Sequence, residues 1–233
     1  MASHAPGDFG VDPIPEPDLA QLVVEDDAPV DNIFSEKQQR LLTEPLYASW
    51  RAAQGVPFLA CANVGLFTSV REQALVPDVM VSIDVVVDSD FSQRKNKSYF
   101  AWQLGKVPEL VIEVVSNQVG GELSDKLRKY ERARITYYVV FDPEHELSVQ
   151  TLHVFELRAG QLVQTDDATF PLLGLGLTLW QGTFEGVQAE WLRWSRPAAA
   201  AGEASLIPTG AERADRAEAE LAALRADLAA RGG

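Results

Sequence analysis

The sequence has little of what several protein classes require. It contains a single cysteine, Cys61, so an internal disulfide and a thiolate metal cage are both excluded. The first residues show no basic segment followed by an apolar stretch, so we expect no secretory signal. The longest uncharged stretch, residues 52–70, is interrupted by glycine, proline and asparagine, so we expect no membrane span and a cytoplasmic protein.

Positive charge is also scarce. The 233 residues carry 20 lysines and arginines against 34 acids, a net charge of −14. A general nucleic-acid coat protein has a basic field over its whole surface, so the net charge argues against that class, whereas a small basic cleft is compatible with it. Hydrophobic residues make up 46%, enough for the core of one large domain with tails.

Composition and periodicity divide the chain into four segments. We predict a mobile acidic arm over 1–30, an α/β domain over 31–195, a linker over 196–210 and an amphipathic helix or coiled-coil tail over 211–233. The domain begins with a helix for which Ser35 is the expected N-cap.

The α/β domain is expected to contain a central mixed β-sheet flanked by helices. Residues 109–115 and 135–141 are apolar runs typical of buried strands, and 123–134 has the pattern of a helix. A strand, a helix and a strand in this order form a crossover unit. Ala159 and Gly160 are expected to form the turn of a later hairpin.

Two carboxylates occur where an apolar strand should exclude charge. Glu113 lies among leucine, valine and isoleucine, and an unpaired carboxylate buried there would cost several kcal/mol. Asp78 opens another apolar strand, and Asp84 and Asp88 share its parity, which predicts one common face. Two carboxylates on adjacent strands suit a hard cation such as Mg²⁺. The alternative is that Asp78 caps a turn and Glu113 pairs with a basic side chain.

The helix after Glu113 carries a basic candidate. Leu123, Leu127 and Tyr130 form the inward face at about 100° per residue, and Lys126 lies next to that face. Lys126 is therefore the lysine best placed to reach the sheet. The alternative is a surface lysine whose stem covers apolar area.

The local charge around this helix is positive. Residues 94–134 contain nine bases and five acids, a local charge of +4, with aromatic residues among them. Such a segment can follow a phosphate backbone, although basic loops are commonly only solvated surface. The residues expected to bind nucleic acid are Lys95, Lys97, Arg128 and Lys129.

Four segments together resemble a known family. They are VPDVM at 76–80, PELVIEVVS at 108–116, DKLRKY at 125–130 and ITYYVVFDP at 135–143. In order and spacing they are similar to the Uma2 family of restriction-endonuclease-like proteins in the PD-(D/E)XK nuclease superfamily. The resemblance implies a restriction-endonuclease-like core over about 31–195.

The resemblance also implies roles for individual residues. Asp78 and Glu113 match the metal-binding acids, and the backbone carbonyl of Val114 would be a third ligand. The lysine that usually follows the glutamate by two positions is replaced by Val115, and the resemblance places it at Lys126, the residue that the helix geometry also favours. Glu36 is a candidate for the superfamily's helical acid.

The expected function is a Mg²⁺-dependent endonuclease that hydrolyses DNA phosphodiester bonds, with Mn²⁺ as a substitute ion. The alternative is a catalytically inactive nuclease-fold protein that binds nucleic acid or supports assembly, and an enzyme acting on RNA or a nucleotide is a further rival.

The tail has its own pattern and its own expected role. Its apolar residues fall on one helical stripe, namely Ala214, Ala217, Leu221, Leu224 and Leu228. A helix this short is marginal alone in water, so we expect it to pack on the core or to support a homodimer.

Overall fold

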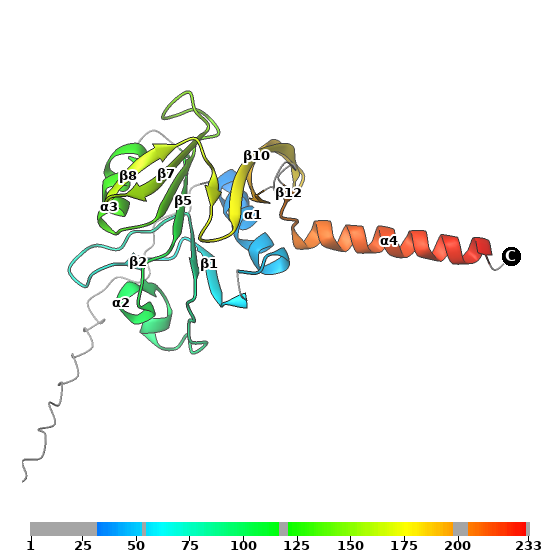
Figure 1. Ribbon diagram of the computed structural model, residues 1–233, viewed down its shortest axis with the longest axis horizontal. Coiled ribbons are helices and arrows are strands. Elements are labelled where there is room, and N and C mark those ends of the chain that lie inside the picture. Colours follow the sequence, from blue (N-terminus) through cyan, green and yellow to red (C-terminus); the bar gives the residue numbers. More distant parts are fainter. Residues whose placement is uncertain (1–31, 53–54, 117–120, 198–204, 232–233) are drawn as a thin grey trace, which may run out of the picture.

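The largest element is a six-stranded mixed sheet. The computed structural model describes residues 32–52, 55–116, 121–197 and 205–231 (Figure 1). In spatial order the strands are β1 (Phe58–Ala62), β3 (Val79–Ile83), β5 (Leu110–Val114), β6 (Tyr137–Phe141), β7 (Leu152–Arg158) and β8 (Gln161–Thr165). Only β5 and β6 pair in parallel, and the other neighbours are antiparallel. The mixed α/β architecture predicted from the sequence is confirmed.

Two smaller sheets complete the β structure. One has the order β12 (Ser205–Leu206), β11 (Val187–Arg196), β10 (Leu175–Phe184) and β9 (Thr169–Phe170). The other pairs β2 (Leu66–Phe67) with β4 (Tyr99–Phe100) in parallel. Because β12 pairs with β11, the predicted linker over 196–210 contains an edge strand of the second sheet.

The helices differ in length and type. They are α1 (Ile33–Ser49), the 3₁₀-helix η3 (Arg94–Asn96), α2 (Ala101–Leu104), the π-helix η4 (Glu122–Lys126), α3 (Leu127–Arg132) and α4 (Gly210–Arg231). The N-cap of α1 is Asn32, not Ser35, because Asn32 Oδ1 accepts the backbone N–H of Ser35 at 2.9 Å. In the described part, no helix combines the length and the apolar character that crossing a lipid bilayer requires.

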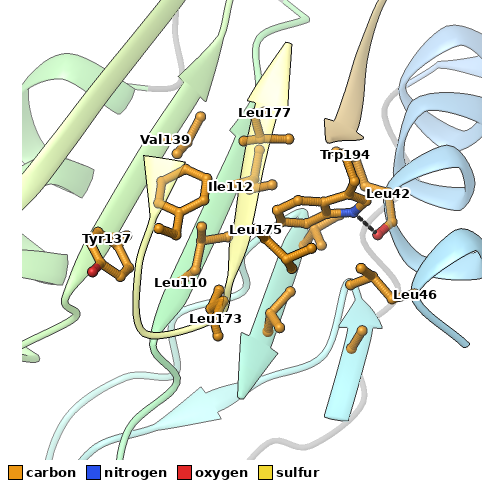
Figure 2. Close-up of a cluster of buried hydrophobic side chains, with 14 of the residues drawn as sticks. Leu42, Leu46, Leu110, Ile112, Tyr137, Val139, Leu173, Leu175, Leu177 and Trp194 are labelled. Atoms are coloured by element: carbon orange, nitrogen blue, oxygen red, sulfur yellow. Dashed lines mark hydrogen bonds between the residues drawn. The ribbon is translucent and has the colours of Figure 1, made fainter. Parts of the chain in front are cut away.

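One face of the large sheet forms the main core. Leu110, Ile112 and Val139 point to this face and pack against α1 and the second sheet. Figure 2 shows Trp194 among the leucines of this core. Its indole Nε1 donates to the backbone oxygen of Leu42 over 2.6 Å. The alternation of side chains along β5 thus places Leu110 and Ile112 on the face toward α1.

The opposite face of the sheet is covered by α3. Val111 and Val115 of β5 point there and pack in a second cluster with Tyr130 and Tyr138. Since strand side chains alternate, Glu113 lies on this same face, between Val111 and Val115. The fold therefore directs the carboxylate of Glu113 toward the helix that follows β5.

Residues outside the described ranges include parts of two sequence predictions. The acidic arm over 1–30 lies outside the described residues, as do 198–204 of the predicted linker. The hairpin turn at Ala159 and Gly160 forms as predicted, with positive φ angles of 49° and 87° between β7 and β8. Two consecutive left-handed residues match the twist that a tight hairpin needs, and Gly160 adopts such angles without strain.

Candidate active site

Asp78 and Glu113 are brought together by the pairing of β3 with β5. The antiparallel register joins Val79 to Ile112 and Met80 to Val111. One further step of that register places Asp78 opposite Glu113, where side chains on the same face lie about 5 Å apart at Cβ. Both carboxylates are buried, Asp78 with 7% and Glu113 with 1% of its surface exposed.

Asp78 is held by neutral hydrogen-bond donors. Gln39 of α1 donates from Nε2 to Asp78 Oδ1 at 3.0 Å, and the backbone N–H of Val114 donates to Asp78 Oδ2 at 2.7 Å. Asn63 then donates from Nδ2 to Gln39 Oε1 at 2.8 Å, and its backbone N–H donates to the carbonyl of Asp78 at 3.3 Å. Asn63 adopts a left-handed φ of 53°, a conformation that asparagine accepts more readily than most residues. Asn63, Gln39 and Asp78 therefore form a closed ring of hydrogen bonds.

Glu113 is held by a cation and a phenol. Lys126 Nζ lies 2.9 Å from Glu113 Oε2, and the hydroxyl of Tyr130 donates to Glu113 Oε1 at 2.6 Å. Both partners come from the helical segment after β5. The structure therefore brings Lys126 to the sheet, on the side that the helix geometry predicts.

Lys126 also contacts a second carboxylate. Its Nζ lies 3.1 Å from Glu122 Oε1, in the π-helical turn of η4. The Tyr138 hydroxyl donates to the backbone oxygen of Glu122 at 2.9 Å and so anchors this turn. Glu122 is buried, and its Oε2 has no hydrogen-bond partner among the described residues. Lys126 is therefore held between two buried carboxylates.

Burial dominates the titration of this cluster. It raises the pKa of Glu113 to about 8; the Asp78 carboxylate acts in the same direction, and Lys126 and Tyr130 oppose it. Burial also favours a lower pKa for Lys126, but Glu113 and Glu122 outweigh it and raise that pKa above its usual value. Burial and the adjacent Glu113 raise the pKa of Tyr130 well above 10, its usual value. Lys126 is thus a cation and Tyr130 a neutral donor at neutral pH.

The other predicted acids lie elsewhere. Asp84 has a φ of 56° and follows the last residue of β3, so the regular strand ends before it and the shared parity with Asp78 is lost. Asp84 and Asp88 are both exposed, which corrects the prediction of one common face. Glu36 is 48% exposed and pairs with Arg40 at 2.9 Å. In α1 it is Gln39, not Glu36, that reaches Asp78.

The residues expected to bind nucleic acid lie in two groups. Lys95 and Lys97 lie in the segment that leaves β3 at its other end from Asp78, in and directly after η3. Arg128 is exposed and lies 3.9 Å from Asp125. Lys129 lines a cavity between α3 and a loop that precedes Asp78, and the other lining residues are Thr68, Glu72, Gln73, Ala74, Leu75 and Arg132.

Asp78 and Glu113 supply carboxylate oxygens, the class of ligand that Mg²⁺ takes in proteins. The described residues contain no group of three or more acidic, histidine or cysteine side chains able to hold a metal. Mg²⁺ is commonly bound by one or two carboxylates together with water, so two acids are sufficient. The N–H of Val114 points at Asp78. Because the N–H and C=O of one strand residue point to the same side, the carbonyl of Val114 borders the same space.

Sequence reasoning missed Gln39 and Glu122, which contact Asp78 and Lys126 directly. Gln39 shares a helical stripe with Leu42 and Leu46, at spacings of three and four residues, so a polar residue on an apolar face was the available signal. Glu122 precedes Lys126 by four residues, the separation at which opposite charges meet on a helix. The signal at Gln39 does not identify Asp78 as its partner, because that contact joins α1 to the sheet.

Comparison with known proteins places this site in a family. A family model named Uma2, with the description "Putative restriction endonuclease", matches residues 21–183, which include Asp78, Glu113 and Lys126. No curated protein and no solved structure gives a significant match. The matched region covers more than half of the 233 residues and contains the complete large sheet. The chain therefore belongs to the Uma2 family.

Proposed function

We propose that the protein is a Mg²⁺-dependent endonuclease that hydrolyses DNA phosphodiester bonds in the cytoplasm. The observation that carries this proposal is the cluster in which Lys126 lies 2.9 Å from buried Glu113, next to Asp78 on the neighbouring strand. Two carboxylates on paired strands can hold a metal ion, and an adjacent lysine can offset the negative charge that develops during phosphodiester hydrolysis. The family description supports the same reaction class.

Each residue has a distinct role in the proposed reaction. Asp78, Glu113 and the carbonyl of Val114 would hold the ion, with Mn²⁺ as a substitute for Mg²⁺. When bound, the ion supplies a polarised phosphate oxygen and a water of lowered pKa. Lys126 orients the attacking water and offsets the negative charge that develops on the phosphate. Glu122 keeps the ammonium group of Lys126 in place through their 3.1 Å contact. The products would carry a 5′-phosphate.

The basic side chains outside the cluster would bind the DNA backbone. Lys129 and Arg132 line the cavity beside α3, and Leu75 of the same cavity lies three residues before Asp78. A DNA strand bound in this cavity would lie next to the carboxylates of Asp78 and Glu113. Arg128, Lys95 and Lys97 would add sequence-independent phosphate contacts, which depend strongly on salt.

The proposal is tested with purified protein and two substrates. Supercoiled plasmid and single-stranded DNA are incubated with Mg²⁺, Mn²⁺ or EDTA, beside an Asp78→Asn variant of the same shape and lower charge. We expect nicking or cleavage with either ion, and none with EDTA or with Asp78→Asn. Cleavage that persists in EDTA, or in Asp78→Asn, would overturn the assignment, and a single-stranded RNA of matching sequence separates DNA from RNA specificity.

Two observations favour a second candidate, a nuclease-fold protein that binds nucleic acid without cutting it. Val115 occupies the position at which the superfamily usually has its lysine, and the chain carries a net charge of −14. This candidate predicts DNA binding without product under every ion condition. Calorimetric titration of Mg²⁺ into the parent and into Glu113→Ala then shows whether the carboxylates still bind the ion.

A further inference from the structure

The first turn of α4 is fixed to the domain. Thr209 and Glu212 form a reciprocal cap, in which Thr209 Oγ1 accepts the N–H of Glu212 at 3.1 Å and Glu212 Oε2 accepts the N–H of Thr209 at 2.8 Å. The buried guanidinium of Arg193 binds both oxygens of Glu212, at 2.8 and 2.7 Å. Arg213 donates to the backbone oxygen of Ala48 at the end of α1. The direction in which α4 leaves the domain is therefore set by these contacts.

The remainder of α4 extends away from the domain with every residue exposed. Residues 214–231 are all exposed, and Figure 1 shows the helix projecting from the body of the molecule. At 1.5 Å per residue this segment spans roughly 27 Å. Leu221, Leu224 and Leu228 are 47%, 61% and 69% exposed on one stripe. Three leucines on one face of an unsupported helix form an apolar surface without a partner in the described chain.

We propose that this stripe binds the same stripe of a second copy of the chain, as a parallel two-stranded coiled coil. The stripe steps by three and four residues from Ala214 to Leu228, the spacing of positions a and d in a heptad. Burying each leucine contributes about 1.5–3 kcal/mol. The alanines nearer the domain leave room for the two helices to approach closely where the domains flank them.

The charges beside the stripe distinguish parallel from antiparallel pairing. With Leu221 at position a, Glu220 is at g of the preceding heptad, and Arg225, five residues after Glu220, is at e. In a parallel pair, each g residue faces the e residue five positions later on the other helix, so Glu220 meets Arg225 of the second copy twice. Antiparallel pairing places Glu220 against Asp227 instead, which is repulsive. The charge pattern therefore favours the parallel pair and places both domains at one end.

The proposal is tested by measuring the mass of the full chain in solution. Light scattering after size exclusion should give twice the 25.5 kDa of one chain at high protein concentration. Leu224→Lys should weaken self-association by at least a hundredfold, because two buried lysines would face each other across the stripe. The matched control Ala226→Lys lies on the opposite face and should leave the dimer intact. A monomeric parent chain, or an unaffected Leu224→Lys dimer, would overturn the proposal.

A charge reversal tests the direction of the pairing. In the parallel pair, Glu220→Arg places like charges together and should weaken the dimer on the order of tenfold. The double variant Glu220→Arg with Arg225→Glu should restore it. In an antiparallel pair Glu220→Arg would instead remove the repulsion from Asp227 and strengthen the dimer, so that result would contradict the parallel arrangement. The thermal unfolding of the domain should not change in any variant, because residues 214–231 are exposed.

Discussion

The two carboxylates of the site lie opposite one another but are held by different chemistry. Asp78 accepts hydrogen bonds from neutral groups, the amide of Gln39 and the backbone N–H of Val114. Glu113 accepts from the ammonium of Lys126 and the hydroxyl of Tyr130. The donors of Asp78 come from elements far away along the chain, whereas those of Glu113 come from the next helical segment.

The contacts of Asp78 set the orientation of its carboxylate, whereas the contacts of Glu113 include a cation. The amide of Gln39 and the backbone N–H of Val114 orient Asp78 and carry no net charge themselves. Glu113 is almost fully buried, which raises its pKa to about 8, and Lys126 opposes that rise. We therefore expect substitutions on the Asp78 side to change metal affinity, and substitutions on the Glu113 side to change turnover and the pH dependence.

The largest effect is expected when the cation beside Glu113 is removed. Lys126→Met should lower the rate of DNA cleavage by about a hundredfold or more, because the developing phosphate charge loses its closest cation. The measurement is single-turnover cleavage at saturating Mg²⁺, with thermal unfolding to verify the fold. The matched control Lys129→Met, on another face of the helix, should mainly weaken DNA affinity and its salt dependence. A Lys126→Met variant with parental activity would contradict the assigned role.

Two adjacent glutamines allow a test of the Asp78 side. Gln39→Leu removes the amide donor to Asp78 and should weaken Mg²⁺ affinity by about 10- to 100-fold, as expected for a partner that orients a ligand. Gln38 is also buried but exchanges both of its amide hydrogen bonds with the backbone of Leu192, at 2.8 and 3.0 Å. Gln38→Leu should therefore lower stability by about 1–3 kcal/mol and leave the Mg²⁺ affinity of the folded protein unchanged. Equal loss of affinity in both variants, measured by calorimetry, would show that Gln39 has no specific role.

The burial of Glu113 predicts a pH dependence of stability in the metal-free protein. Its pKa is about 8 when folded, against 4.5 as the usual value, so the folded state holds a proton that the unfolded state releases. The free energy of unfolding should therefore fall as pH rises from about 4.5 to about 8. Glu113→Gln cannot titrate and should flatten this decline. Urea unfolding in EDTA at several pH values checks the difference, and identical slopes in both proteins would rule out Glu113 as its source.

The smallest effect is expected from the phenol that contacts Glu113. Tyr130→Phe removes a 2.6 Å hydrogen bond that favours the charged carboxylate, so the pKa of Glu113 should rise further. Stability should fall by about 1–2 kcal/mol, and Mg²⁺ binding should require a higher pH. Tyr138→Phe loses a hydrogen bond to the backbone of Glu122 and is the control. It should cost similar stability without moving the pH midpoint of Mg²⁺ binding, and a common shift in both variants would count against the contact.

Several elements could be predicted from local sequence alone. The apolar runs at 109–115 and 135–141, predicted as buried strands of a crossover unit, contain β5 and β6, which pair in parallel. The Ala159 and Gly160 turn also formed. These features depend on residue alternation and turn chemistry, which act over a few residues. The separate sheet over residues 169–206 could not be predicted from local sequence, because the packing of β10 and β11 on α1 depends on contacts between distant segments.

Within the site, the sequence determined which groups needed partners, and the tertiary structure decided which partners they found. A carboxylate at Glu113 in an apolar strand had to be compensated, and helix geometry was enough to bring Lys126 close, because both belong to one crossover unit. Helix geometry alone could not show that Gln39, and not Glu36, contacts Asp78. Which side of α1 faces Asp78 depends on how that helix packs on the sheet, and so on the burial of leucines and tryptophans contributed by segments far apart in the chain.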